Sequence, residues 1–135
     1  MQEVEFIKKG QQLLALIVRR DFTKSGTEFF TPPDLPQQVG FISKKKGEVI
    51  KAHSHRQIKR EISLTQEVLM VRRGRVKVDF YDNEKIFVNS KTLDDGDVIL
   101  IAGGGHSYEA LEDLEMIEIK QGPYLGKDDK ITFES

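Results

Sequence analysis

The stretch EVLMVRRGRVKVDFY, residues 67–81, decides the fold, because apolar and polar side chains alternate along both of its halves. In a β-strand this alternation places Glu67, Leu69 and Val71 on one face, whereas a helix would spread them around its circumference. Gly74 separates the two halves at a position typical of a turn, so we expect a β-hairpin here. The apolar members of the second half are Val76, Val78 and Phe80.

Similar short runs, separated by turn residues such as Asp94-Asp95-Gly96, occupy most of the chain and predict an all-β domain. The run within residues 10–22 fits a buried strand or a short helix, and its β-branched residues favour the strand. Prolines 32, 33 and 36 indicate an irregular connection. Further strands are expected in segments 38–46 and 48–55, paired around Gly47, and in segments 85–90, 97–102, 106–111 and 116–121.

The chain of 135 residues is expected to form a single domain spanning 1–135. The core of this domain is expected within residues 38–121, preceded by N-terminal strands in residues 1–37. The tail, residues 122–135, is expected to cross back over the domain or to contact a partner subunit.

Composition narrows the classes of function. The absence of cysteine excludes disulfides and thiolate metal ligands, and it fits a cytoplasmic location. The near balance of 21 basic and 22 acidic residues gives no general attraction to nucleic acid. The longest apolar run near the N-terminus, LLALIV, is too short to cross a membrane, so we expect neither nucleic acid nor membrane as a partner.

The three histidines are His53, His55 and His106. If residues 48–55 form a strand, His53 and His55 point to the same face, where they could share a metal ion, be bridged by water, or face solvent. Glu67 shares its predicted face with core residues, and a buried carboxylate needs a metal ion or a basic partner to offset its desolvation. If that strand is turned over, Glu67 is solvated instead.

These residues resemble the two sequence motifs of the cupin superfamily. Gly47 is followed after five residues by His53-Ser54-His55, and Glu67 is followed after six residues by Gly74, as in the first motif. The stretch GDVILIAGGGH, residues 96–106, is similar to the second motif. Two features depart from the pattern: eleven residues, RQIKREISLTQ, separate His55 from Glu67, and GGG replaces the usual Pro-x-Gly bend. The likeness covers roughly residues 47–110.

The resemblance implies a small single-domain cupin, which is a double-stranded β-helix or jelly-roll barrel, and a homodimer. It also implies one divalent metal ion near the open end of the barrel. The metal could be Fe, Mn, Zn or Ni, because nitrogen and carboxylate ligands accept all of them. The implied ligands are His53, His55, Glu67 and His106.

The resemblance leaves three functions open. The first is a metalloenzyme, of oxygenase or isomerase type, acting on a small polar metabolite, such as a sugar derivative, that binds the metal through oxygen. The second is a non-catalytic domain that binds a small ligand or a metal. The third is a metal-free barrel similar to nucleotide-sugar isomerases. Candidates for lining the pocket are Tyr108, Glu109 and Arg56, the last within the lengthened connection 56–66.

Overall fold

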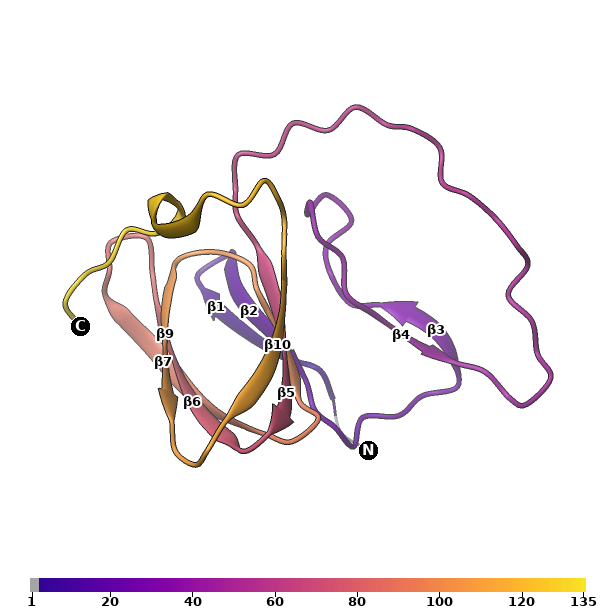
Figure 1. Cartoon of the computed structure of the whole chain (residues 1–135), viewed down its shortest axis with the longest axis horizontal. Coiled ribbons are helices and arrows are strands. Elements are labelled where there is room, and N and C mark those ends of the chain that lie inside the picture. The colour runs from indigo at the N-terminus through magenta and orange to yellow at the C-terminus, as the bar shows by residue number, and fades with distance from the viewer. Residues whose placement is uncertain (1–2) are drawn as a thin grey trace.

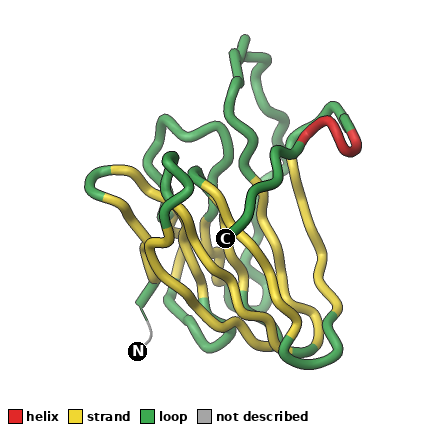
Figure 2. The backbone as a smooth tube through the Cα atoms, turned by 90° about the vertical axis from the view of Figure 1, so that its left-hand side faces the viewer, coloured by secondary structure: helices red, strands yellow, loops and turns green. Residues whose placement is uncertain are grey.

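The computed structural model describes residues 3–135 and confirms an all-β fold (Figures 1 and 2). None of the described residues belongs to a helix long and apolar enough to cross a membrane. The elements are β1 (Glu5–Lys9), β2 (Gln12–Val18), β3 (Gly26–Phe29), β4 (Gly40–Ser43), β5 (Glu67–Arg73), β6 (Arg75–Tyr81), β7 (Phe87–Asp94), β8 (Val98–Ile101), β9 (Gly105–Ala110), β10 (Glu115–Lys120) and the short 3-10 helix η1 (Gly126–Asp129).

Two antiparallel sheets form a β-sandwich around the core. One sheet has five strands in the order β1-β2-β8-β5-β10, and the other has three strands in the order β7-β6-β9. The alternation predicted from the sequence holds, because alternate residues are buried in both strands: Glu67, Leu69 and Val71 in β5, and Val76, Val78 and Phe80 in β6. The buried core includes Ile7, Leu14, Ala15, Ile17, Leu69, Val71, Val76, Val78, Phe80, Leu93, Ile99 and Ile101.

The hairpin predicted for residues 67–81 is wrong, although both of its strands are present. Strand β5 pairs with β8 and β10, whereas β6 pairs with β7 and β9. Gly74 therefore carries the chain from one sheet to the other, with a φ of +102° that favours glycine. Alternation defines which face of each strand is buried. The alternating pattern is the same whether two consecutive strands pair with each other or lie in different sheets.

The ambiguous run in residues 10–22 is a strand, as favoured. Strand β2 lies between β1 and β8, and its residues 14–17 are all buried. A strand covered on both faces has no solvent side that would require polar residues. This environment explains why the apolar run is continuous and does not alternate with polar residues.

The pairing predicted around Gly47 is also wrong. Strand β4 pairs with β3 in a separate two-stranded sheet, and the prolines lie in the irregular connection between these two strands, as predicted. Residues 44–65, which we call the arm, contain no strand and are exposed throughout. The arm loops away from the sandwich before the chain enters β5 (Figure 1).

The closed barrel expected from the resemblance is not found within residues 3–135. Strands β9 and β10 are the terminal strands of the two sheets, and they follow one another in the chain without pairing. Each therefore has one free edge. The sandwich is consequently open between these two strands.

The tail crosses back over the domain, which was one of the two alternatives expected. The ring of Phe133 packs edge-on against Tyr81, with 5.2 Å between centroids. Lys120 Nζ, at the end of β10, lies 3.0 Å from Asp129 Oδ2 in η1. These contacts hold the tail against the end of the sandwich at which β5 begins and β10 ends (Figure 2).

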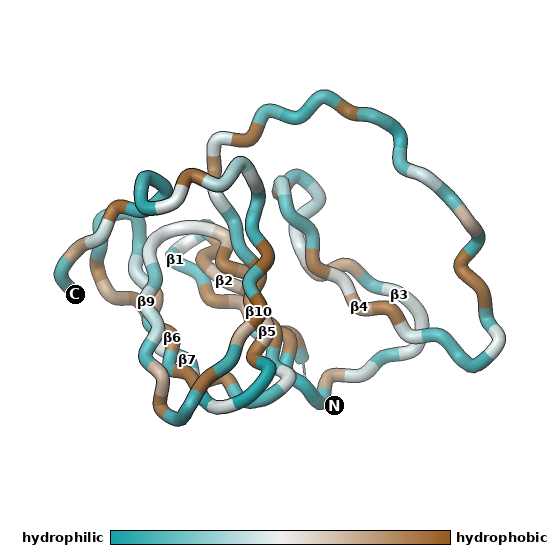
Figure 3. The backbone as a smooth tube through the Cα atoms, viewed as in Figure 1, coloured by the Kyte–Doolittle hydropathy of each residue, from teal (hydrophilic) through white to brown (hydrophobic). Residues whose placement is uncertain are grey.

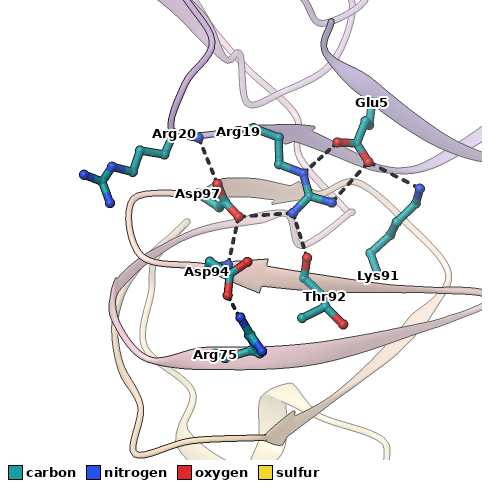
Figure 4. A network of polar contacts seen from close by, with 8 residues as sticks. All are labelled: Glu5, Arg19, Arg20, Arg75, Lys91, Thr92, Asp94 and Asp97. Atoms are coloured by element: carbon teal, nitrogen blue, oxygen red, sulfur yellow. Dashed lines mark hydrogen bonds and ion pairs between the residues drawn. The ribbon is translucent and has the colours of Figure 1, made fainter. Parts of the chain in front are cut away.

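At the opposite end of the sandwich, Arg19 links strands that are distant in the sequence (Figure 4). Its Nε lies 2.6 Å from Glu5 Oε2, and its Nη1 lies 3.1 Å from Asp97 Oδ2 and 2.7 Å from the carbonyl oxygen of Thr92. The buried Asp97 carboxylate also accepts hydrogen bonds from the backbone N–H groups of Arg20 and Asp94. The network stabilises the loop between β7 and β8.

Replacing Arg19 by Met is expected to lower the free energy of unfolding by about 2–3 kcal/mol at pH 7, because charged hydrogen bonds to a buried carboxylate are lost. The hydrogen bond from Arg19 lowers the pKa of Glu5 below its ordinary value of 4.5 despite partial burial. The contribution of this pair is therefore complete above that value and is lost as the pH falls through the folded-state pKa. Urea unfolding at several pH values measures the difference in free energy of unfolding between the wild type and Arg19→Met. This difference should become smaller in acid.

Arg20→Met is the matched control, because the Arg20 guanidinium forms no hydrogen bond or ion pair within the described part of the chain. Its effect should stay within about 0.5 kcal/mol at every pH, as for ordinary surface substitutions. Equal effects of the two substitutions would show that the network contributes nothing specific.

Candidate functional site

The interior of the sandwich contains a polar cluster near the end where β5 and β9 begin. Glu67 is the first residue of β5, and His106 is the second residue of β9. The preceding residue, Gln66, is fully buried and holds the start of β5 in place. Its backbone N–H donates to Gln121 Oε1 at 2.7 Å, and its side-chain Nε2 donates to the carbonyl oxygen of Ala102 at 3.1 Å.

Glu67 and His106 contact each other directly. His106 Nε2 lies 2.8 Å from Glu67 Oε1, and the Tyr108 hydroxyl donates to the same oxygen at 3.3 Å. Glu67 is only 9% exposed, so its carboxylate lies in a largely apolar interior. His106 Nδ1 is buried and has no hydrogen-bond partner among residues 3–135, which leaves a lone pair or a proton unsatisfied.

A second carboxylate, Glu118 of β10, hydrogen-bonds to Glu67 but is itself exposed. Burial favours the neutral form of Glu67, but hydrogen bonds from His106 and Glu118 and the charge of His106 lower its pKa. The hydrogen bond to Glu67 raises the pKa of Glu118, and burial raises the pKa of Tyr108. These contacts favour the anionic form of Glu67, to which the Tyr108 hydroxyl donates a hydrogen bond.

The structure brings together only two of the four predicted metal ligands. His53 and His55 lie on the arm, exposed and outside any strand, with their rings in a T-shaped arrangement and 5.3 Å between ring centroids. The predicted inward-facing strand around them is therefore wrong for this structure. No group of three or more His, Asp or Glu side chains is placed to hold a metal ion in the range 3–135.

Of the three residues predicted to line a pocket, only one lies beside Glu67. Tyr108 is partly buried beside Glu67. Glu109 is the next residue on β9, so it points outward, where it lies 3.4 Å from Lys77 Nζ. Arg56 is exposed on the arm.

Sequence reasoning missed Glu118. The signal was present, because Met116, Glu118 and Lys120 alternate along β10 and share one face. Glu118 pairs in register with Leu69, whose side chain is buried in the core. Ile117 and Ile119, on the opposite face of β10, are exposed.

No protein-family model matches this chain, and no match is found among the curated proteins or the solved structures. The likeness to the cupins therefore rests on the residues and spacings in the sequence.

Proposed function

We propose that this chain is a metal-dependent enzyme of the cupin type, which binds one divalent ion with His53, His55, Glu67 and His106 and acts on a small polar metabolite. One observation carries the proposal: the buried carboxylate of Glu67 contacts His106, whose second ring nitrogen has no partner. A carboxylate and an imidazole nitrogen held together in an apolar interior are ligands that divalent transition metals bind.

The remaining residues of the cluster support a catalytic role. A divalent ion held by three imidazoles and one carboxylate supplies Lewis acidity or dioxygen chemistry, depending on the metal. The Tyr108 hydroxyl donates a hydrogen bond to Glu67 and so orients this ligand. Glu118 lies beside Glu67, and the hydrogen bond between the two carboxyl groups raises the pKa of Glu118.

A second candidate is a metal-free site that uses Glu67 and His106 for acid–base chemistry. The 2.8 Å contact between His106 Nε2 and Glu67 Oε1 favours it, because this arrangement orients the imidazole without a metal. The two candidates differ in one measurable property: removal of metal by a chelator abolishes activity in the first and leaves it unchanged in the second.

Elemental analysis of protein purified without chelators and without a metal-affinity column tests the proposal. The wild type should contain about one divalent ion per chain, and the His53→Ala/His106→Ala variant should contain none, because two of the four ligands are lost. The control is Gln57→Ala/Ser107→Ala, which changes exposed neighbours on the same two segments and should retain the metal. Circular dichroism shows whether each variant is folded.

The proposal fails if the folded wild type remains as empty as the double variant after incubation with iron, manganese, zinc and nickel separately. The metal-free site would then be the leading candidate. Metal that is retained equally by the wild type and the double variant would also contradict this ligand set.

A further inference from the structure

A cavity of about 370 Å³ lies where the start of β1 meets the segment that leads into β3. Its walls carry half of the eight phenylalanines of the chain: Phe6, Phe22, Phe29 and Phe30. A cavity of this size suits a small ligand. The described residues that line it belong to none of the strands that carry the candidate site, so the two places are separate.

The aromatic rings of the cavity stand at steep angles to one another and are supported from behind. The rings of Phe22 and Phe30 are 5.3 Å apart at their centroids and nearly perpendicular, at 86°. Phe22 also packs edge-on against Phe41 of β4, at 5.0 Å (Figure 3 shows hydrophobic residues along this strand). The Phe29 ring lies so close to Gly40 that a Cβ there would be 2.8 Å from it. The walls are therefore held rings that face in different directions, as in aromatic cages that bind organic cations.

Two of the four rings are largely exposed to water. Phe6 is 48% exposed and Phe29 is 59% exposed, although both line the same cavity. The face of an aromatic ring carries partial negative charge, so it attracts a cation. The chain already shows this attraction, because Lys8 Nζ lies 5.9 Å from the centroid of the Phe6 ring. A cationic ligand would cover exposed rings and gain the same interaction.

The charged side chains of the cavity also favour a cation. Among the described residues that line it, the charged ones are Glu3, Lys24 and Glu28, so acidic groups outnumber basic ones. Lys24 pairs with Glu28, but the two side chains are 44% and 42% exposed. An exposed ion pair of this kind contributes little stability, so a bound cation can take the place of Lys24 beside Glu28.

The chemistry of the rings narrows the kind of cation. Phenylalanine offers no hydrogen-bond acceptor like a carbonyl, so an ammonium with N–H groups would lose hydrogen bonds to water on entering the cavity. A quaternary ammonium group has no N–H to leave unsatisfied. From these observations we propose that this cavity binds a small quaternary ammonium compound, with its cation among the phenylalanine rings and its charge balanced by Glu3 and Glu28. The inference is independent of the proposed metal site.

The first test compares two ligands of the same shape on the full wild-type chain. Choline is the cationic probe, and the control is its neutral analogue, in which a carbon atom replaces the nitrogen. An NMR titration at constant ionic strength follows the backbone amide signals. Choline should shift the signals of residues 22–30 saturably and bind at least about tenfold more tightly than the analogue. Equal affinities would overturn the proposal in favour of a purely apolar site, and the absence of a saturable shift in these residues would also refute it.

Three variants locate the site and the sign of its charge. Lys24→Met removes the competing cation and should tighten choline binding about twofold to fivefold, whereas a site for anions would respond in the opposite direction. Phe6→Leu keeps an apolar side chain but removes a ring, and should weaken choline binding about threefold to fivefold. Phe87→Leu, at a 55% exposed phenylalanine outside the cavity, should leave the affinity unchanged. With all three variants folded by circular dichroism, weaker binding by Lys24→Met or an unchanged affinity in Phe6→Leu contradicts the proposal.

Discussion

Replacing Phe80 by Ala is expected to lower the free energy of unfolding by about 3–5 kcal/mol, because a large buried side chain is lost and a cavity remains. Phe80 is 1% exposed and is among the largest fully buried side chains of the described chain. It pairs in register with His106 across β6 and β9, so the two side chains share the inner face of their sheet. Urea unfolding followed by circular dichroism measures the loss.

Phe87→Ala is the control for this prediction. Phe87 lies on the neighbouring strand β7, but it is 55% exposed, and its main aromatic contact is with Tyr81 at 6.0 Å. Its removal should cost less than about 1 kcal/mol, because little apolar surface leaves the core. Similar losses for the two substitutions would show that Phe80 is not part of the core in solution.

Gly74→Ala is expected to destabilise the fold by roughly 2–5 kcal/mol, because two unfavourable terms combine. The φ of +102° at this corner costs a residue with a Cβ about 1–2 kcal/mol. The added Cβ would also lie 2.1 Å from the carbonyl oxygen of Asp113, so the backbone between β9 and β10 must shift. Thermal or urea unfolding gives the magnitude.

Gly47→Ala separates the cost of the positive φ from the cost of the steric clash. Gly47 has a similar φ of +91°, but nothing lies within 4 Å of an added Cβ, and the residue belongs to the exposed arm. Its substitution should cost about 1–2 kcal/mol, which is the backbone term alone. If Gly74→Ala were no more destabilising than Gly47→Ala, the close approach of β6 to the connection between β9 and β10 would be wrong.

The corner at Gly74 bears on the candidate site as well as on stability. It directs β5, with Glu67, into one sheet and β6 into the other, where β6 pairs with the strand that carries His106. The two residues therefore approach each other across the interior from different sheets. The sandwich remains open on the side between β9 and β10.

The sequence by itself determined which face of each strand is buried. The alternation in residues 67–81 placed Glu67, Leu69 and Val71 inward, and all three are buried in the structure. This prediction succeeds because successive side chains of a strand point to opposite faces whatever its partner is. Turn residues likewise marked the ends of several strands, including the Asp94-Asp95-Gly96 turn before β8.

Only the tertiary structure decided which strands pair. Strands β5 and β6 lie in different sheets, and β4 pairs with β3 rather than with residues 48–55. Pairing depends on backbone groups that are the same in every residue except proline, so the side-chain pattern does not select the partner.

For the candidate site, too, some features were predictable from the sequence and others depended on the tertiary structure. From the sequence, Glu67 was expected to point inward and to meet His106, and the structure places them 2.8 Å apart. The predicted inward positions of His53 and His55 required residues 48–55 to form a strand, and a strand requires a free sheet edge with which to pair. In the structure the arm pairs with no sheet edge, so both histidines are exposed, and only the tertiary structure decides this.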